Sequence, residues 1–203
     1  MTRICFVRHG ETDWNIELRM QGHVDIPLNE SGLSQAAALG RHFAGGMHAD
    51  ALYSSDLLRA RQTAQPMADA LGLPVIPIVE LRERSFGRCE GLVIGEILER
   101  FPEEAMAMKR RDADHVPQGG ESRRQHHDRI RACVQRLAEQ HPSETLVAVT
   151  HGGVLDVIYR MATGLAIEAP RNYPIGNASV NWVRIEGEEW VIESWGEVAH
   201  LGC

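Results

Sequence analysis

Two stretches of sequence decide the fold: ICFVRHG at residues 4–10 and LVAVTHGG at residues 146–153. Each begins with four consecutive apolar residues, a pattern typical of a parallel strand that is covered on both faces. In each stretch a histidine, His9 or His151, follows the strand and is itself followed at once by glycine. Because ligands of open α/β sheets bind beyond the carboxyl ends of the strands, the two histidines predict one functional site at that edge.

The rest of the chain alternates between helical and strand-like segments. Caps such as Ser31 and the run Ser54-Ser55-Asp56 mark predicted helix starts, and glycines mark the ends. The predicted helices cover 33–43, a segment ending near 71, 96–109, 121–140 and 154–163, and the further strands cover 51–53, 74–79, 180–185 and 190–195. This alternation predicts an α/β fold, a three-layer sandwich with a mostly parallel central sheet and an antiparallel edge hairpin, in a single domain over 1–203.

The composition excludes several classes of chemistry. The chain has 203 residues and a formal net charge of −7, which argues against a nucleic-acid partner. Lys109 is the only lysine, so the Gly-Lys-Ser/Thr of a P-loop is absent and a Schiff-base lysine would have to lie in a polar run. No apolar stretch is long enough to span a membrane, and Cys5, Cys89, Cys133 and Cys203 form no regular framework. We therefore expect a cytoplasmic protein with no membrane partner.

An arginine at a helix start gives an independent hint of an anion. Arg59 falls in the first turn of the predicted helix, where the helix dipole disfavours a cation unless an anion lies nearby. Arg61 is two residues further on, so only one of the two side chains can face a site. The other is expected at the surface, and solvent exposure remains the alternative for Arg59 as well.

Two glutamates are candidates for a general acid, Glu83 in LRER and Glu121 in GGES. Either could equally be a surface residue, and flanking arginines would keep Glu83 ionised in water unless burial or a bound phosphate supplies its proton. The runs DADH at 112–115 and HHD at 126–128 look like metal-ligand clusters. Adjacent helical residues point about 100° apart, so we interpret both runs as solvated surface and expect no metal site.

Blocks of sequence in a fixed order extend from one end of the chain to the other. They are VRHGETDWN (7–15), QGHVDIPL (21–28), SSDLLRARQTA (54–64), LRERSFG (81–87) and VTHGG (149–153). Together they resemble the histidine phosphatase superfamily, which includes the cofactor-dependent phosphoglycerate mutases.

The resemblance implies a metal-independent phosphatase without a cofactor, in which His9 forms a phosphohistidine. His9 would attack as a neutral imidazole, with its other nitrogen donating to a backbone carbonyl. Arg8, Arg59 and His151 would hold the phosphoryl oxygens. Glu83 would protonate the leaving oxygen and then activate water. The substrate-binding residues implied are Arg8, Asn15, Gln21, Gly22, Arg59, His151 and Gly152.

Three functions stay open from the sequence. A phosphomonoester hydrolase acting on a small phosphorylated metabolite is favoured, because the segment before residues 119–122 is shorter than in the family's mutases and leaves phosphohistidine accessible to water. A cofactor-dependent phosphoglycerate mutase is the first alternative, which the pair Glu83-Arg84 favours; Cys89 also stands where many family phosphatases carry Trp. A protein that only binds a phosphorylated ligand is the second alternative.

Four further arginines bear on the choice of substrate. They are Arg84, Arg88, Arg110 and Arg111, which could favour an acidic leaving group or simply be solvated surface charge. Separately, the edge of the hairpin offers a surface for a homodimer.

Overall fold

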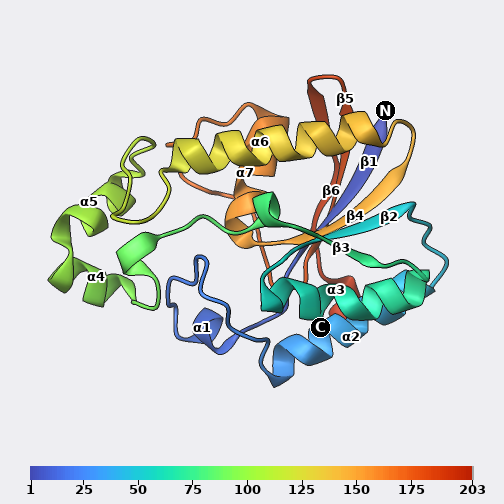
Figure 1. Cartoon of the computed structure of the whole chain (residues 1–203), viewed down its shortest axis with the longest axis horizontal. Helices are drawn as coiled ribbons and strands as arrows, with labels where there is room; N and C mark the ends of the chain where they lie inside the picture. The colour runs from blue at the N-terminus through green and yellow to red at the C-terminus, as the bar shows by residue number, and fades with distance from the viewer. Residues whose placement is uncertain (203) are drawn as a thin grey trace.

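A six-stranded sheet forms the centre of the computed structural model, which describes residues 1–202 (Figure 1). Its strands are β1 (Thr2–Arg8), β2 (Ala51–Ser55), β3 (Val75–Ile78), β4 (Thr145–Thr150), β5 (Val180–Glu186) and β6 (Glu189–Glu197). They lie in the order β3-β2-β4-β1-β5-β6; the first four of these run parallel, whereas β5 pairs antiparallel with β1, and β6 with β5. The predicted sheet with its antiparallel edge hairpin is confirmed.

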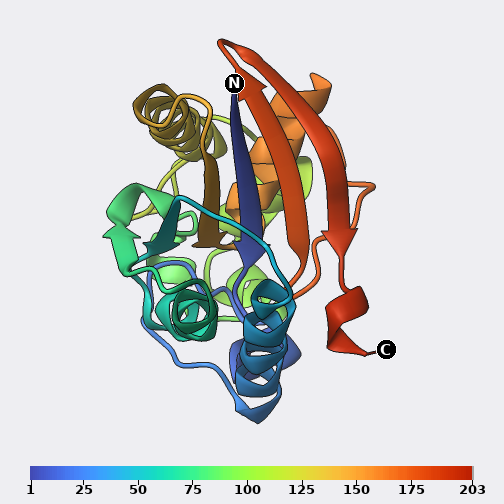
Figure 2. The same cartoon turned by 90° about the vertical axis from the view of Figure 1, so that its right-hand side faces the viewer.

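Helices cover both faces of the sheet. They are α1 (Asp13–Ile16), α2 (Glu30–Ala44), α3 (Leu58–Leu71), α4 (Ile94–Arg100), α5 (Pro102–Arg110), α6 (Arg123–Gln140) and α7 (Gly152–Thr163). The pair α2 and α3 lies on one face, and the pair α6 and α7 on the other (Figures 1 and 2). Alternate residues of β1 serve the two layers: Ile4 and Phe6 pack towards α6 and α7, and Cys5 and Val7 towards α2 and α3. This is the predicted three-layer arrangement.

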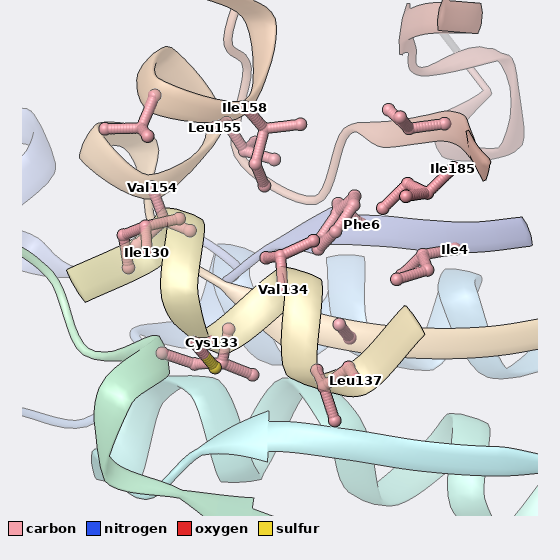
Figure 3. Close-up of a cluster of buried hydrophobic side chains, with 14 of the residues drawn as sticks. Ile4, Phe6, Ile130, Cys133, Val134, Leu137, Val154, Leu155, Ile158 and Ile185 are labelled. Carbon is pink, nitrogen blue, oxygen red and sulfur yellow. The ribbon is translucent and has the colours of Figure 1, made fainter. Parts of the chain in front are cut away.

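Figure 3 shows the apolar cluster between the sheet and α6. Ile130, Val134 and Leu137 recur at helical spacing on α6 and are buried together with Ile4 and Phe6 of β1. Because these contacts hold β1 from its middle, they fix the position of its carboxyl end, where the first histidine follows.

Two helices begin with caps other than those predicted. At α2 the side chain of Asn29, not Ser31, accepts the backbone amide three residues on, at 2.8 Å. At α3 the N-cap position is Leu57, which has no capping side chain, and Asp25 accepts the first helical amide at 2.5 Å. The run Ser54-Ser55-Asp56 therefore does not cap α3, which leaves its side chains for other contacts.

The prediction of a single helix over 96–109 is wrong, because α4 ends at Arg100 and α5 begins at Pro102. Phe101 between them has φ −140° and ψ 66°, a non-helical backbone, as expected because the ring of Pro102 disfavours helical geometry in the residue before it. The two helices lie together at one end of the molecule (Figure 1). The helix predicted from residue 121 starts at Arg123, with Ser122 as its cap.

Three cysteines are buried in the described part of the chain. Cys5, Cys89 and Cys133 are buried free thiols, and Cys203 lies outside the described residues. Within residues 1–202 no helix combines the length and the apolar character needed to cross a membrane.

Candidate active site

The two histidines after the buried strands lie together, as their positions predicted. The parallel register places the ends of β1 and β4 side by side, and the backbone amide of His9 donates to the carbonyl of Thr150 at 2.8 Å. The imidazole rings of His9 and His151 are 5.2 Å apart between centroids, and both residues are buried. Two titratable rings at one sheet edge form the centre of the candidate site.

His9 is held as a neutral imidazole with one nitrogen free. Its Nδ1 lies 2.7 Å from the carbonyl oxygen of Gly10, which can only accept, so Nδ1 carries the hydrogen. Burial and the charges of Arg59 and Arg8 hold the pKa of His9 well below its ordinary value. Nε2 therefore keeps its lone pair at neutral pH, which is the state that a nucleophile requires.

His151 presents a hydrogen-bond donor beside that lone pair. The hydroxyl of Ser55, at the end of β2, lies 2.8 Å from His151 Nε2 and has no other acceptor within residues 1–202. The hydroxyl therefore donates to Nε2 and leaves the ring hydrogen on Nδ1. Nδ1 is buried and has no hydrogen-bond partner in the described chain.

Arg8 and Arg59 lie near the two histidines, and each has an unpartnered N–H. Arg59 is fully buried, and its two terminal nitrogens donate to the carbonyls of Gly22 and Val24 at 2.8 and 2.9 Å. Burial lowers the pKa of Arg59 to about 10, so the guanidinium remains charged at neutral pH. Arg8 donates from Nη1 to Ile175 at 2.7 Å. In both arginines, Nε is buried without a partner among the described residues.

Three buried donors without partners thus belong to residues that lie close to His9. We call Arg8 Nε, Arg59 Nε and His151 Nδ1 the donor cradle. A buried polar group without a partner costs about 1–3 kcal/mol, so three together call for a ligand that supplies acceptors. An oxyanion supplies several acceptor oxygens and negative charge, and the lone pair of His9 Nε2 would face its central atom.

The segment between β1 and α2 mainly holds the donor cradle in position and adds few donors to it. Gly22 has φ +49°, and its carbonyl holds Arg59. Gln21 donates to the hydroxyl of Thr12 at 2.8 Å, and its buried Oε1 is an acceptor without a partner in residues 1–202. Asn15 Oδ1 accepts the Thr12 amide, which leaves the Asn15 amide nitrogen as a donor. Gly152 is the first residue of α7, where the helix dipole favours an anion.

Two residues that were not predicted from the sequence hold the segment from His9 to Asn15 in place. Asn177 Nδ2 lies 3.0 Å from the His9 carbonyl and 3.1 Å from Asn15 Oδ1. Thr63 Oγ1 accepts the Gly10 amide at 2.9 Å. Asn177 follows no strand and belongs to no polar cluster, and Thr63 lies in the block at 54–64 without a feature of its own, so neither is identified as a site residue.

Glu83 is the acid that adjoins the cradle. Its Oε2 accepts the Gly153 amide at 2.8 Å, and its Oε1 accepts the Arg84 amide at 2.7 Å. Its backbone carbonyl is held by His23 Nε2 at 2.8 Å and by Arg129 Nη2 at 3.2 Å. A carboxyl group held in this position can give a proton to an atom of a ligand bound at the donor cradle and take a proton back.

Glu121, the other candidate acid, has a structural role. Both of its oxygens accept from Arg129, at 2.8 Å each, and Oε2 also accepts the Ser85 amide. Burial raises the pKa of Glu121, but the hydrogen bonds from Arg129 and Ser85 outweigh it and the pKa lies below its ordinary value. Glu121 therefore stays ionised and fixes the loop that carries Glu83.

We expect Gly153→Ala to displace the acid from its position. A Cβ on Gly153 would lie 2.0 Å from Glu83 Oε1, so the carboxyl group has to move. A displacement of about 1 Å costs roughly 100-fold in rate. Steady-state hydrolysis of an alkyl phosphate measures it, with Gly95→Ala as the control because the space around Gly95 is open. Equal activity of the two variants would show that the position of the carboxyl group is unimportant.

The candidate metal clusters do not form sites. In residues 1–202 no three His, Cys, Asp or Glu side chains lie close enough to hold a metal ion. His115 pairs with Glu104, and His127 Nδ1 lies 3.1 Å from Asp128. His126 corrects the prediction of a solvated run: it is buried, because α6 turns this side of its first turn towards the protein interior.

The buried histidines predict a loss of stability in acid. Burial, the first cause in each case, lowers the pKa of His9, His126 and His151 well below the ordinary 6.5. The unfolded chain therefore takes up protons first, so their contribution is complete above pH 6.5 and is lost as the pH falls below it. The slope approaches about 1.4 kcal/mol per pH unit for each histidine. Urea unfolding in phosphate-free buffer at pH 7.5 and 5.5 measures it, and equal free energies of unfolding would contradict the prediction.

Three comparisons relate this chain to known proteins. The Histidine phosphatase superfamily (branch 1) matches residues 4–198. The chain is 41% identical over 202 residues to "Phosphoglycerate mutase-like protein 4" of Arabidopsis thaliana, covering 98% of this chain and 86% of the relative. It is 40% identical over 203 residues to "Metal-independent phosphoserine phosphatase" of the same plant, covering 99% and 84%.

A solved structure agrees in fold. The mycobacterial glucosyl-3-phosphoglycerate phosphatase in complex with VO3 superposes with a TM-score of 0.84 at 32% identity, over 97% of this chain and 99% of that chain. The family match, the relatives and the fold lead to one conclusion. The chain belongs to branch 1 of the histidine phosphatase superfamily and is an enzyme that hydrolyses phosphomonoesters.

Proposed function

We propose that His9 is the nucleophile of this phosphatase and that the donor cradle holds the phosphoryl group. One observation carries the proposal: the unprotonated Nε2 of His9 lies at the same sheet edge as three buried N–H donors without partners. A transferred phosphoryl group has three peripheral oxygens on which negative charge spreads in the transition state. Donors fixed before the reaction stabilise that charge without reorganisation.

The reaction divides into two steps. His9 Nε2 forms a bond to phosphorus as the bond from phosphorus to the leaving oxygen breaks, and the protonated carboxyl of Glu83 gives its hydrogen to that oxygen. Water then attacks the phosphohistidine, and the Glu83 carboxylate takes a proton from it. Phosphate leaves, and His9 is neutral and Glu83 protonated again.

Each remaining residue of the predicted set has a proposed place in this scheme. Arg8, Arg59 and His151 bind the phosphoryl oxygens through the cradle. The free amide donors of Asn15 and of the backbone at Gly152 bind the same group. Gln21 and Gly22 act through the loop, since the Gln21 amide holds Thr12 and the Gly22 carbonyl holds Arg59.

A small phosphorylated metabolite is the proposed substrate, and hydrolysis the proposed outcome. The names of the relatives, which refer to phosphoserine and to glucosyl-3-phosphoglycerate, support a small substrate. The short segment between Glu83 and Glu121 supports transfer to water, because little chain is available to enclose the phosphoenzyme. Mutase activity is the second candidate, supported by the phosphoglycerate mutase-like relative.

One experiment separates these possibilities. The purified protein is assayed with p-nitrophenyl phosphate in EDTA, and the enzyme is quenched during turnover of labelled substrate. We expect phosphate release that survives chelation, and label on His9 that resists alkali and is lost in acid. Strict metal dependence or an unlabelled enzyme would refute the mechanism. Isomerisation of 3-phosphoglycerate without phosphate release would show a mutase, and binding without turnover a binding protein.

The cellular setting belongs to the same proposal. Three buried free thiols support a reducing, cytoplasmic environment. The outer edge of β6 pairs with no strand in residues 1–202 and supports a homodimer through that edge, which light scattering on the purified protein tests.

A further inference from the structure

A carboxylate that takes no part in the proposed reaction, that of Glu90, lies between two segments of the site. Glu90 belongs to the loop before α4, and the chain next to it is fixed by backbone pairing. The Gly91 amide donates to the Met20 carbonyl at 2.8 Å, and the Met20 amide donates to the Leu92 carbonyl at 3.0 Å. This pairing brings Glu90 beside the turn at residues 21–24.

One oxygen of Glu90 accepts hydrogen bonds from both segments. Oε1 accepts the backbone amide of His23, in the turn, at 3.1 Å. It also accepts the Phe86 amide at 2.9 Å and the Ser85 hydroxyl at 3.2 Å, and both donors lie in the loop that carries Glu83. We call these three hydrogen bonds the Glu90 bridge. Because charge-assisted hydrogen bonds are short and strong, the bridge fixes the distance between the turn and the loop.

The turn at residues 21–24 holds the guanidinium group of Arg59. The carbonyls of Gly22 and Val24 accept its two terminal nitrogens, and the Val24 amide closes the turn by donating to the Gln21 carbonyl at 3.0 Å. The guanidinium group makes no other hydrogen bond within residues 1–202, so these two carbonyls determine where its Nε points. A contact that holds the turn therefore orients one donor of the cradle.

The turn and Glu90 also pack closely against each other. A Cβ on Gly22 would lie 2.1 Å from Glu90 Oε1, and its three nearest atoms would all belong to the Glu90 side chain. The carboxylate is near enough to Arg59 to affect its charge: burial lowers the pKa of Arg59, and nearby carboxylates, that of Glu90 among them, oppose the shift. Packing and hydrogen bonding thus hold Glu90 and the turn in one arrangement.

We infer that Glu90 is a positioning residue, which holds the turn that binds Arg59 against the loop that carries Glu83. His23 adds a second connection, since its ring Nε2 lies 2.8 Å from the Glu83 carbonyl. This role rests on the proposed function, in which Arg59 binds the phosphoryl group and Glu83 transfers the proton. Without the bridge the two groups can shift relative to each other, and a displacement of about 1 Å costs roughly 100-fold in rate.

Glu90→Ala and Glu90→Gln separate hydrogen bonding from charge. Oε1 accepts all three bonds of the bridge and Oε2 accepts none within residues 1–202, so glutamine can keep an oxygen in the bridge. We expect Glu90→Ala to weaken inorganic phosphate about 10-fold in calorimetry and to lower kcat for p-nitrophenyl phosphate about 100-fold. Glu90→Gln should restore both values to within about fivefold of the wild type. Equal losses in the two variants would show that charge matters instead of position and would overturn the inference.

Glu96→Ala is the matched control for a loss of stability. Glu96 Oε2 also accepts a backbone amide, that of Val93 at 2.9 Å, and lies 3.2 Å from Arg19 Nη1. It makes no hydrogen bond to the turn or to the loop of Glu83 within residues 1–202. Urea unfolding should show a lower stability for both alanine variants, whereas kcat and phosphate affinity should fall only in Glu90→Ala. Equal kinetic losses in the two variants would make Glu90 structural and overturn the inference.

Gly22→Ala tests the same contact while the carboxylate stays in place. Its Cβ displaces the Glu90 side chain in the wild type, but in the Glu90→Ala background those atoms are gone. The strain of a positive φ is present in both backgrounds, so the difference between them isolates the contact. We expect Gly22→Ala to lower kcat about 100-fold in the wild type and about fivefold at most in Glu90→Ala. Equal factors in the two backgrounds would overturn the inference.

Phosphate affinity keeps the role of Glu90 separate from the proposed mechanism, because it requires no turnover. If the wild type neither hydrolyses p-nitrophenyl phosphate nor forms phosphohistidine, the proposed function falls. A phosphate affinity about 10-fold weaker in Glu90→Ala would still support the positioning of Arg59. Equal phosphate affinities of the wild type and Glu90→Ala would refute it.

Discussion

His9→Ala is expected to lower kcat/KM for phosphomonoesters by about 10⁴-fold or more, because the substitution removes the atom that forms the covalent intermediate. The neighbouring His151 cannot replace it, because His151 Nε2 accepts a hydrogen bond from Ser55 and His151 Nδ1 carries a hydrogen. The residual rate would come from the cradle, which still binds and polarises the substrate. Initial rates with p-nitrophenyl phosphate measure the loss, and quenching with labelled substrate should show no phosphoenzyme.

The control for this experiment is His48→Ala. The side chain of His48 is 81% exposed and lies 3.1 Å from the Asp50 carboxylate, so we expect full activity from the control. The His9 variant should keep its fold, and it should still bind inorganic phosphate, because the three donors remain. Phosphoenzyme formation in His9→Ala would place the nucleophile on another residue.

Glu83→Gln is expected to act according to the leaving group. An alkyl alcohol leaves poorly without a proton, so we expect a loss of about 10²- to 10⁴-fold on phosphoserine or glycerol phosphate. p-Nitrophenolate leaves without a proton, so the first step should be little affected for the aryl ester. Glutamine keeps the size of the side chain, but its single oxygen can accept only one of the two backbone amides that the Glu83 carboxylate holds.

The comparison of two substrates makes this test specific. With the aryl ester, dephosphorylation becomes rate-limiting in Glu83→Gln, because the same group activates water, and a burst of p-nitrophenol equal to the enzyme should precede a slow phase. Glu99→Gln is the control, since Glu99 is exposed on α4. A uniform loss on both esters without a burst would assign Glu83 a positioning role instead.

The buried strands and their histidines were predictable for a simple reason. A parallel strand that is covered on both faces needs consecutive apolar residues, so β1 and β4 are visible in the sequence. A side chain that follows such a strand lies at the sheet edge whatever the rest of the chain does. Arg59 was recognisable by a second local rule, its place in the first turn of α3. The structure buries Arg59 and exposes Arg61, as expected if only one of the two faces the site.

The errors arose where several local choices compete. Asn29 and Ser31 both suit a helix cap, and the backbone geometry before α2 decides in favour of Asn29. Ser55 is also a residue type that caps helices, but its hydroxyl donates a hydrogen bond to His151, which follows a different strand. The break at Pro102 was different, since a proline restricts the residue before it and the signal was present.

By itself the sequence determined the α/β fold and the position of two histidines and an arginine at the ends of its strands. It also excluded P-loop and Schiff-base chemistry, because Lys109 is the only lysine. These conclusions depend on periodicity, composition and immediate neighbours, which a linear chain records.

Only the tertiary structure decided which atoms are free to react. The contact between Glu83 and the Gly153 amide joins residues 70 apart in sequence, and that between Asn177 and the His9 carbonyl joins residues 168 apart. Such contacts leave no local pattern, yet they hold Glu83 at the Gly153 amide, commit Glu121 to Arg129, and determine which ring nitrogens of His9 and His151 carry a hydrogen. Hydrogen-bond partners and burial depend on packing between distant segments, so the chemistry of each nitrogen and carboxyl group becomes definite only in the folded chain.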